Sequence, residues 1–504
     1  MAASLPPIVR PRPPSRLLHG VLEALLTSRW VLVCAIVVGY WAHLHFSERI
    51  GHHDGLGDDG VYFAKPALEG LSVVWEKKID GYYLQRVLPS LLVRGVYRLL
   101  HVEVTIPRVV SGFQTENLCL VALSAYLYTR VAQRLAISPF ARTAGGLCIF
   151  VSFGVAKWTV FDPVLTDLWA FAIGWIYLVA WLERRPWLIA STALVGAFCW
   201  PSALQTGVVL LLGLGFGEPV DAGAEPAPFR LHLVVGGLAA ALYLRFAWPA
   251  IHTYAPPNGP AKPEAWCLIP ALLIGAGALG WGLAHLADDR VYYSPSRWVR
   301  ALLSWPVFLG VGAWWLSTIA LRRYSDGSAF IDIRDLWAIT AYTSAAKPGV
   351  FLLAHVLFFG PLLLVCCLRC ASIMGQIRNT GAGAVAVVAM LVVLGLNSES
   401  RRLYLLVPFV LPFAIVELER CRLSRRAWGW LVALSAFGSK VWLQIDTDLT
   451  RTSSLEGPGQ TLFMTSGPWM SWSSYLWQGL FVFAAAFWLH RELHSSEASA
   501  SPAP

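Results

Sequence analysis

The sequence predicts an all-α protein that crosses a membrane many times, and three observations carry this prediction. Hydrophobic residues make up 56% of the 504 residues and charged residues only 14%, whereas about a quarter of a soluble domain is charged. Apolar runs of about 20 residues, the length that crosses a bilayer core, recur along the chain. The 24 Trp and 16 Tyr are typical of a protein with many membrane–water boundaries, where amphipathic rings settle.

The chain begins with a Pro- and Arg-rich stretch within residues 1–27, which we expect to be disordered and cytoplasmic. The first apolar run, residues 28–46, is longer than a signal-peptide core and lacks a small-residue cleavage site. We therefore expect it to remain in the protein as the first transmembrane helix.

The longest polar interval follows, and we expect residues 47–112 to form the first outer loop. Within it, residues 82–99 carry apolar side chains at helical spacing on one face, with Arg86, Arg94 and Arg98 on the other. This pattern predicts an amphipathic helix, kinked at Pro89, that lies in the membrane interface with its apolar face in lipid.

The remaining apolar runs bring the expected total to about 14 spans. The break at Trp200-Pro201 is either a kink or a tight outer turn. We place the later spans near 113–130, 143–160, 165–182, 187–203, 204–217, 231–249, 267–287, 300–320, 347–368, 381–396, 403–418, 428–445 and 471–490.

Arginines in the short loops predict which end of the spans is cytoplasmic. The other end then carries the first outer loop, the turn near Asp162, residues 250–265, residues 322–346, residues 397–402 and residues 446–470. The arginine-rich end carries Arg130, Arg134, Arg142, Arg184, Arg185, Arg369, Arg378, Arg420, Arg422, Arg425 and Arg426.

Composition and motifs exclude several function classes. The net charge of +9 fits arginine-rich cytoplasmic loops, and no basic and aromatic groove pattern indicates nucleic-acid binding. The sequence has no phosphate-binding Gly-rich loop, no nucleophile elbow and no H-E-x-x-H motif, so soluble cofactor chemistry is not expected. The nine Cys lie in or beside apolar runs and are expected to pack as small hydrophobic residues.

Acidic residues gather at the predicted outer end. Asp58 and Asp59 follow the first span, Asp162 lies in a very short turn with Asp167 close behind it, and Glu399 lies in another short turn. A carboxylate in partly apolar surroundings is costly unless it is paired or functional, and burial that raises its pKa makes it a stronger general base. Each acid alone fits an ordinary polar turn, but three acidic segments at one end favour a site.

Basic residues accompany these acids. Arg401 and Arg402 open a span at the same end, where a guanidinium can hold a lipid phosphate in a two-pronged contact or simply reach ordinary phospholipid. Arg86 faces the same layer, and Lys157 is near enough in sequence to pair with Asp162.

Histidines supply the one cofactor that the sequence suggests. His43, His45, His52 and His53 cluster at the outer end of the first span. His52 and His53, beside the acidic pair, form a candidate site for a divalent metal ion, whereas the i, i+2 spacing of His43 and His45 is poor for two ligands on one helix.

These features resemble the GT-C superfamily of integral-membrane glycosyltransferases, which includes polyprenyl-phosphate-mannose-dependent mannosyltransferases and lipid A aminoarabinose transferases. The resemblance is one of pattern over residues 28–420. It rests on Asp58-Asp59-Gly-Val-Tyr62, Arg86-Val-Leu-Pro89, Phe161-Asp162-Pro163-Val-Leu-Thr-Asp167, Glu183-Arg184-Arg185, Trp200-Pro201-Ser202 and Ser400-Arg401-Arg402-Leu-Tyr404-Leu-Leu-Val-Pro408.

The resemblance implies an inverting enzyme that takes a sugar from a polyprenyl-phosphate donor on the outer face of a bacterial inner membrane. By this resemblance Asp58 or Asp59 is the base, and Asp162 positions the acceptor or a metal ion. The adjacent acids depart from the split D-x-D of the family, which leaves the base unassigned. The donor phosphate would be held by Arg401, Arg402 or Arg86, with Lys157, Asp167 and Glu399 as further substrate-binding residues.

The same resemblance sets the domain organisation. Residues 28–420 would form the catalytic domain, residues 421–490 would add C-terminal transmembrane helices, and residues 491–504 would form a disordered tail. The expected partners are a lipid-phosphate-linked sugar and membrane lipids.

A transporter or lipid flippase is the alternative function, and a structural scaffold is a third. Transporters place ionisable groups near the bilayer midplane. Here His285 and His355 are among the few ionisable residues inside the predicted spans, while the acids lie at one edge. This distribution favours catalysis over transport.

Overall fold

The computed structural model describes residues 28–76, 79–216, 229–253, 263–287, 295–326, 333–444 and 467–500. Every regular element in these ranges is a helix, which confirms the all-α class for the part of the chain described. The expected disorder of residues 1–27 and most of the 446–470 loop lie outside these ranges.

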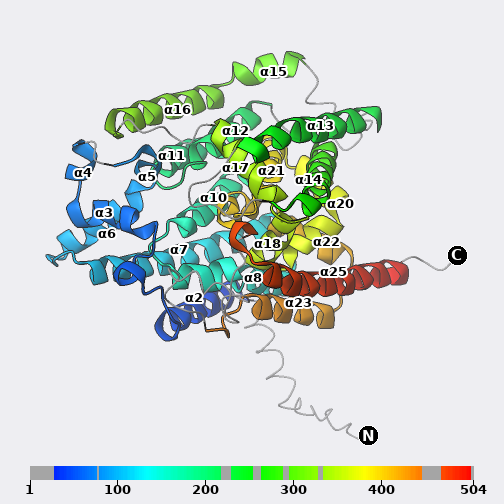
Figure 1. Ribbon diagram of the computed structural model, residues 1–504, viewed down its shortest axis with the longest axis horizontal. Helices are drawn as coiled ribbons and strands as arrows, with labels where there is room; N and C mark the ends of the chain where they lie inside the picture. The colour runs from blue at the N-terminus through cyan, green and yellow to red at the C-terminus, as the bar shows by residue number, and fades with distance from the viewer. Residues whose placement is uncertain are drawn as a thin grey trace, which may run out of the picture.

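A central bundle fills the middle of the molecule (Figure 1). It is centred on α10, which is apolar on all faces after its first residue, Asp167, and includes the buried rings of Trp175, Tyr177 and Trp181. A helix that is apolar on all faces is a core or membrane-embedded helix. The bundle comprises α2 (Arg29–Phe46), α7 (Ile106–Arg134), α8 (Pro139–Phe150), η2 (Phe153–Trp158), α9 (Thr159–Phe161), α10 (Asp167–Leu182), α11 (Pro186–Gly196), α12 (Ala203–Gly215), α18 (Val350–Phe359), α19 (Leu362–Leu368), α20 (Cys370–Arg378), α21 (Ala382–Leu394), η4 (Ser400–Leu403), η5 (Val407–Phe409) and α22 (Leu411–Arg420).

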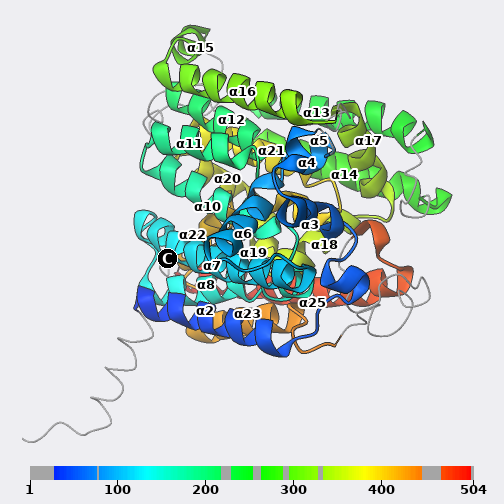
Figure 2. The same ribbon diagram turned by 90° about the vertical axis from the view of Figure 1, so that its left-hand side faces the viewer.

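Further helices flank this bundle. In both views α15 and α16 lie along one edge, and α2 and α23 lie along the opposite edge (Figures 1 and 2). The flanking helices are α13 (Phe229–Thr253), α14 (Ala265–Leu286), α15 (Pro295–Leu302), α16 (Trp305–Tyr324), α17 (Ile333–Ala345), α23 (Arg425–Gly438), η7 (Gly467–Trp469) and α25 (Trp472–Ala500).

The long apolar helices indicate membrane association. Three of them are long and apolar enough to cross a bilayer alone: α2, residues His232–His252 of α13, and α14. Three bent pairs also qualify when each pair is taken as one span: α8 with residues 153–161, α15 with α16, and α17 with α18. Large side chains such as Phe308, Trp315 and Phe483 are exposed, as expected of lipid-facing helices. The total of about 14 spans stays a prediction.

Two boundaries differ from expectation in the second half of the chain. Part of the segment 322–346, expected as an outer loop, forms α17. The last helix, α25, continues to Ala500, past residue 490, where we expected the last span to end and a disordered tail to begin.

The break at Trp200-Pro201 separates α11 from α12. The two helices pack closely, since a Cβ added at Gly207 would lie 2.6 Å from the Cβ of Ala193. The break is therefore a tight turn rather than a kink.

The first outer loop forms a layer of short helices at one end of the bundle (Figures 1 and 2). Its helix α3 packs against α6, and both pack against α7. The layer consists of η1 (His52–Gly55), α3 (Gly60–Glu69), α4 (Ser72–Trp75), α5 (Gly81–Leu84) and α6 (Val87–Leu99).

The amphipathic helix expected over residues 82–99 is two helices, and the prediction of a kink at Pro89 is wrong. The chain breaks at Gln85-Arg86, where the Leu88 amide donates to the carbonyl oxygen of Phe198 at 3.0 Å. Pro89 lies in the first turn of α6, where a missing N–H leaves no helical bond unmade. The outward face of α6 is apolar and includes exposed Leu92, Val96 and Leu99, as a helix lying in the interface requires.

Charged groups lie at both ends of α10. Glu183, just after its C-terminus, is buried and forms ion pairs with Arg130, Arg134 and Arg185. Asp167 opens the helix at the other end. Sixteen helical residues span about 24 Å, so the two groups are nearly a bilayer core apart.

Candidate functional site

The site begins with a left-handed turn after the first span. His53, Asp54, Gly55 and Gly57 all have positive φ angles between 50° and 90°. The turn brings Gly57 against Asp162: a Cβ added at Gly57 would lie 3.0 Å from the Oδ2 of Asp162. Glycine at this position therefore allows the outer loop to contact the acidic turn between α9 and α10.

Two hydrogen bonds to backbone carbonyl oxygens fix the acidic turn. The Ile50 amide donates to the carbonyl oxygen of Phe161 at 2.9 Å, and the Asn117 side-chain amide donates to the carbonyl oxygen of Pro163 at 2.9 Å. The backbone around Asp162 is thus fixed from both sides.

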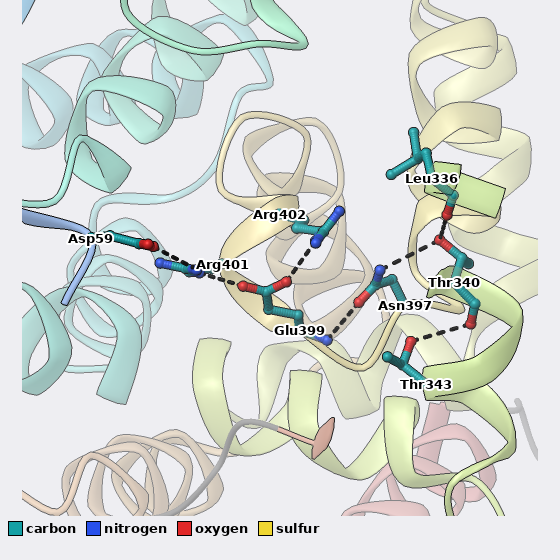
Figure 3. A network of polar contacts seen from close by, with 8 residues as sticks. All are labelled: Asp59, Leu336, Thr340, Thr343, Asn397, Glu399, Arg401 and Arg402. Carbon is teal, nitrogen blue, oxygen red and sulfur yellow. Dashed lines mark hydrogen bonds and ion pairs between the residues drawn. The ribbon is translucent and has the colours of Figure 1, made fainter. Parts of the chain in front are cut away.

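A second segment, residues 397–402, is held by several side-chain hydrogen bonds and contacts the outer loop at Asp59 (Figure 3). The Asn397 side chain accepts from the Glu399 amide at 2.9 Å and donates to Thr340 Oγ1 at 3.4 Å. Glu399 Oε1 accepts from Arg401 Nε, and its Oε2 accepts from Arg402 Nε at 2.7 Å. One buried carboxylate therefore orients both guanidinium groups.

Arg401 joins this segment to the outer loop. Its Nη2 lies 3.1 Å from the Oδ2 of Asp59, so the guanidinium bridges Asp59 and Glu399 (Figure 3). The side chains of Asp59 and Arg401 are 33% and 23% exposed, whereas that of Glu399 is only 7% exposed. The Asp59–Arg401 pair is therefore the accessible layer of the site, and Glu399 lies beneath it.

Electrostatics distinguish the acids. Burial and the nearby carboxyl of Asp167 raise the pKa of Asp162 well above its usual value, against the opposing charge of Arg401. Burial would also raise the pKa of Glu399, but the guanidinium groups of Arg402 and Arg401 outweigh it and hold that pKa well below its usual range. Burial therefore favours the neutral form of Asp162, and the two arginines favour the ionised form of Glu399.

Asp162 and Asp167 each keep an unused oxygen. Both are buried, and the Oδ1 atom of each has no hydrogen-bond partner among the described residues. Asp167 Oδ2 accepts from Trp158 Nε1 at 3.0 Å. A buried carboxyl oxygen without a partner costs free energy, and a ligand hydroxyl would satisfy it.

Arg86 is buried rather than on the solvent face of its helix. Its guanidinium carbon lies 4.3 Å from the ring centre of Trp200, 4.5 Å from that of Tyr82 and 5.2 Å from that of Phe63. The Nε and Nη1 atoms have no hydrogen-bond partner among the described residues. Arg86 and Arg401 both lie near enough to Asp167 for their charges to act on its carboxyl.

Two predicted residues lie apart from this cluster. Lys157 does not pair with Asp162; its Nζ donates to Glu48 Oε1 at 2.5 Å and to the carbonyl oxygen of Leu443 at 3.0 Å. Asp58 pairs with His52 rather than with Arg401; its Oδ1 lies 3.2 Å from His52 Nε2. Asp58 and His52, together with His53, are the residues able to hold a metal ion in the described part of the chain.

The residues that hold the side chains of the site in place were not identified from the sequence. Asn397, which orients Glu399, and Trp158, which donates to Asp167, were not singled out. The aromatic cage around Arg86 was also missed, because its members come from three separate segments. A usable signal was the N-x-E-x-R-R spacing, which places one acid within reach of both arginines.

Comparison of the chain with family models, with curated proteins and with solved structures found no match in any of the three. The function is therefore argued from the chemistry of this site.

Proposed function

We propose that this protein is a GT-C-like membrane glycosyltransferase that moves a sugar from a polyprenyl-phosphate donor to an acceptor hydroxyl. The observation that supports this most is the meeting of Asp59 and Arg401, which are 342 residues apart in the chain, above the buried carboxyls of Asp162 and Glu399. A candidate base beside a cation fits a reaction that removes a proton and releases a phosphate.

In this proposal Asp59 is the general base. Its carboxylate takes the proton of the acceptor hydroxyl, and the hydroxyl oxygen attacks the anomeric carbon of the sugar. The bond from that carbon to the phosphate oxygen breaks, and both electrons leave with the polyprenyl phosphate. Attack from the face opposite the phosphate inverts the anomeric centre.

Arg401 and Arg86 are the proposed ligands of the donor phosphate. A guanidinium stabilises a phosphate by parallel charge-assisted hydrogen bonds. Arg86 has two buried N–H groups without a partner, and Arg401 is held in place by Glu399. A donor phosphate that takes over Arg401 would also free Asp59 to act as a base.

Asp162 is the proposed acceptor-positioning residue. Burial raises its pKa and so favours the protonated carboxyl, which can donate a hydrogen bond to the acceptor. Its unpartnered Oδ1 supports such a contact.

The proposed setting is the inner membrane of a bacterial cell, with the site outside and the N-terminus in the cytoplasm. The arginines around Glu183 support this orientation, since cytoplasmic ends of spans are enriched in Lys and Arg.

The test is a transfer assay with the full chain in liposomes and radiolabelled polyprenyl-phosphate sugars, including mannose and aminoarabinose. We expect Asp59→Asn to lower transfer by about 10²- to 10⁴-fold, the usual contribution of a general base. Asp54→Asn is the matched control, because it makes the same change in the same turn and Asn tolerates its left-handed backbone. Retained transfer in Asp59→Asn would contradict the assignment.

An assay of lipid movement in the same liposomes distinguishes a glycosyltransferase from a flippase. A flippase would move a labelled lipid-linked sugar between leaflets without forming free polyprenyl phosphate. Lipid movement in the absence of any transfer would overturn the glycosyltransferase proposal.

A further inference from the structure

A second constellation lies next to the candidate base, on the other side of the same turn. His52 Nε2 lies 3.2 Å from Asp58 Oδ1, and the rings of His52 and His53 are in contact, with centres 3.7 Å apart. Donor atoms of His52, His53 and Asp58 all lie within 4.8 Å of one another. In a tetrahedral zinc site with bonds of about 2.05 Å, donor atoms are about 3.3 Å apart. The His52–Asp58 pair already has this spacing.

The tautomer of His53 is set by its backbone contact. His53 Nδ1 lies 3.1 Å from the carbonyl oxygen of Gly57. A carbonyl oxygen only accepts, so Nδ1 carries the proton and Nε2 keeps its lone pair. Histidines that bind metal ions usually donate their second ring nitrogen in this way, which fixes the ring for coordination.

The backbone of the turn is strained in a way that a bound ion would offset. His53 and Asp54 are consecutive non-glycine residues with φ angles of 50° and 57°. Such angles are unfavourable for residues that carry a Cβ. An ion bound by residues 52, 53 and 58 would close this turn at both ends.

We propose that His52, His53 and Asp58 bind a Zn²⁺ ion that fixes the turn carrying Asp59. Two imidazoles and one carboxylate suit zinc, whereas Mg²⁺ and Ca²⁺ prefer oxygen ligands alone. The Asp58 side chain is 81% exposed, so water completes the coordination. The ion acts through the backbone, because Asp58 is the neighbour of Asp59 in sequence while the two carboxyls contact different partners.

The effect on catalysis rests on the proposed function, but zinc binding does not. The two are therefore measured separately, and zinc bound by a protein inactive in transfer would still support this inference.

The primary test is zinc binding by the purified full chain in detergent after removal of metals with a chelator. Affinity is measured by competition with a chromophoric zinc indicator. We expect one tight site per chain, and a loss of at least about tenfold in affinity in each of His52→Ala, His53→Ala and Asp58→Asn. His101→Ala is the matched control, since His101 is another exposed histidine with a left-handed backbone in the outer segment. It should bind zinc like the wild type.

A second measurement needs no variant. Hydrogen exchange of residues 51–59 in the wild-type protein should slow on addition of Zn²⁺ and not of Mg²⁺. The inference is overturned if the wild type has no tight site, if His52→Ala, His53→Ala and Asp58→Asn bind zinc as tightly as the wild type, or if zinc leaves exchange in this turn unchanged.

Discussion

At the scale of single residues, Glu399 has the clearest role. It is buried and accepts from both Arg401 and Arg402, which together hold its pKa well below the usual range. The carboxylate therefore acts as the fixed counter-charge that aims two guanidinium groups.

Glu399→Gln should lower the free energy of unfolding by about 2–3 kcal/mol at neutral pH, somewhat less than for a fully buried pair because the arginines are partly exposed. Because the folded pKa lies below the ordinary value of 4.5, this stability is full above pH 4.5 and is lost as the pH falls towards the folded pKa. Thermal unfolding in detergent across pH measures the difference.

The difference in free energy of unfolding between the wild type and Glu399→Gln should shrink in acid, because the wild-type carboxylate becomes protonated there. Glu69→Gln, at an exposed position, serves as the control and should change stability little. If this difference in free energy of unfolding stays constant with pH, the charge of the Glu399 carboxylate is not what stabilises residues 397–402.

The charged residues of the site were predictable from the sequence, whereas the partners that hold them were not. Asp59 and Arg401 stand out because charged groups are rare in this apolar chain. Arg86 was placed on a polar helix face, since helical periodicity treats arginine as a solvent-facing residue. Its burial depends on the rings of Trp200 and Tyr82, which only the folded chain brings together.

At the scale of elements, the turn from residue 51 to 59 decides whether the site forms. It contacts the acidic turn through Gly57, whose φ is +68°. A left-handed turn of this kind was not predictable from Gly55 and Gly57 alone, because Gly-rich loops are common. The two helices α5 and α6 were likewise predicted as one, since their apolar pattern runs through the break.

Gly57→Ala should destabilise the protein by about 1–3 kcal/mol, because alanine is strained at this φ and its Cβ would lie 3.0 Å from Asp162 Oδ2 and 3.1 Å from the Cδ1 of Ile50. Thermal unfolding measures the loss. Gly95→Ala in α6 is the control, since its Cβ would meet nothing within 4 Å, and it should be neutral or stabilising by up to about 1 kcal/mol. Equal effects at both positions would argue against a close contact at Gly57.

At the scale of the whole molecule, the arginine cluster around Glu183 at the C-terminal end of α10 supports the proposed orientation. Composition predicted a helical membrane protein, and the described residues confirm helices throughout. The number of spans could not be fixed in the same way, because α11, α12 and α21 are shorter than a bilayer-crossing helix and others are bent.

The proposed orientation predicts a labelling pattern in intact cells. In a background without native cysteines, Glu69→Cys in the outer layer should react with a membrane-impermeant maleimide, whereas Gln133→Cys near the Glu183 cluster should react only after lysis. Both positions are exposed, so access rather than burial decides the result. The reverse pattern would place the site in the cytoplasm and exclude an extracytoplasmic donor.

The central claim is that Asp59 and Arg401 act together in one reaction centre, and a double-mutant cycle on transfer tests it most directly. The kcat/KM of Asp59→Asn, Arg401→Lys and the double variant are compared with that of the wild type. If the two residues share one site, the double variant should lose little more than the worse single variant, with a coupling above about 1 kcal/mol. If the fold-losses in kcat/KM of the two single variants multiply in the double variant, the two residues act independently, which would contradict a shared reaction centre.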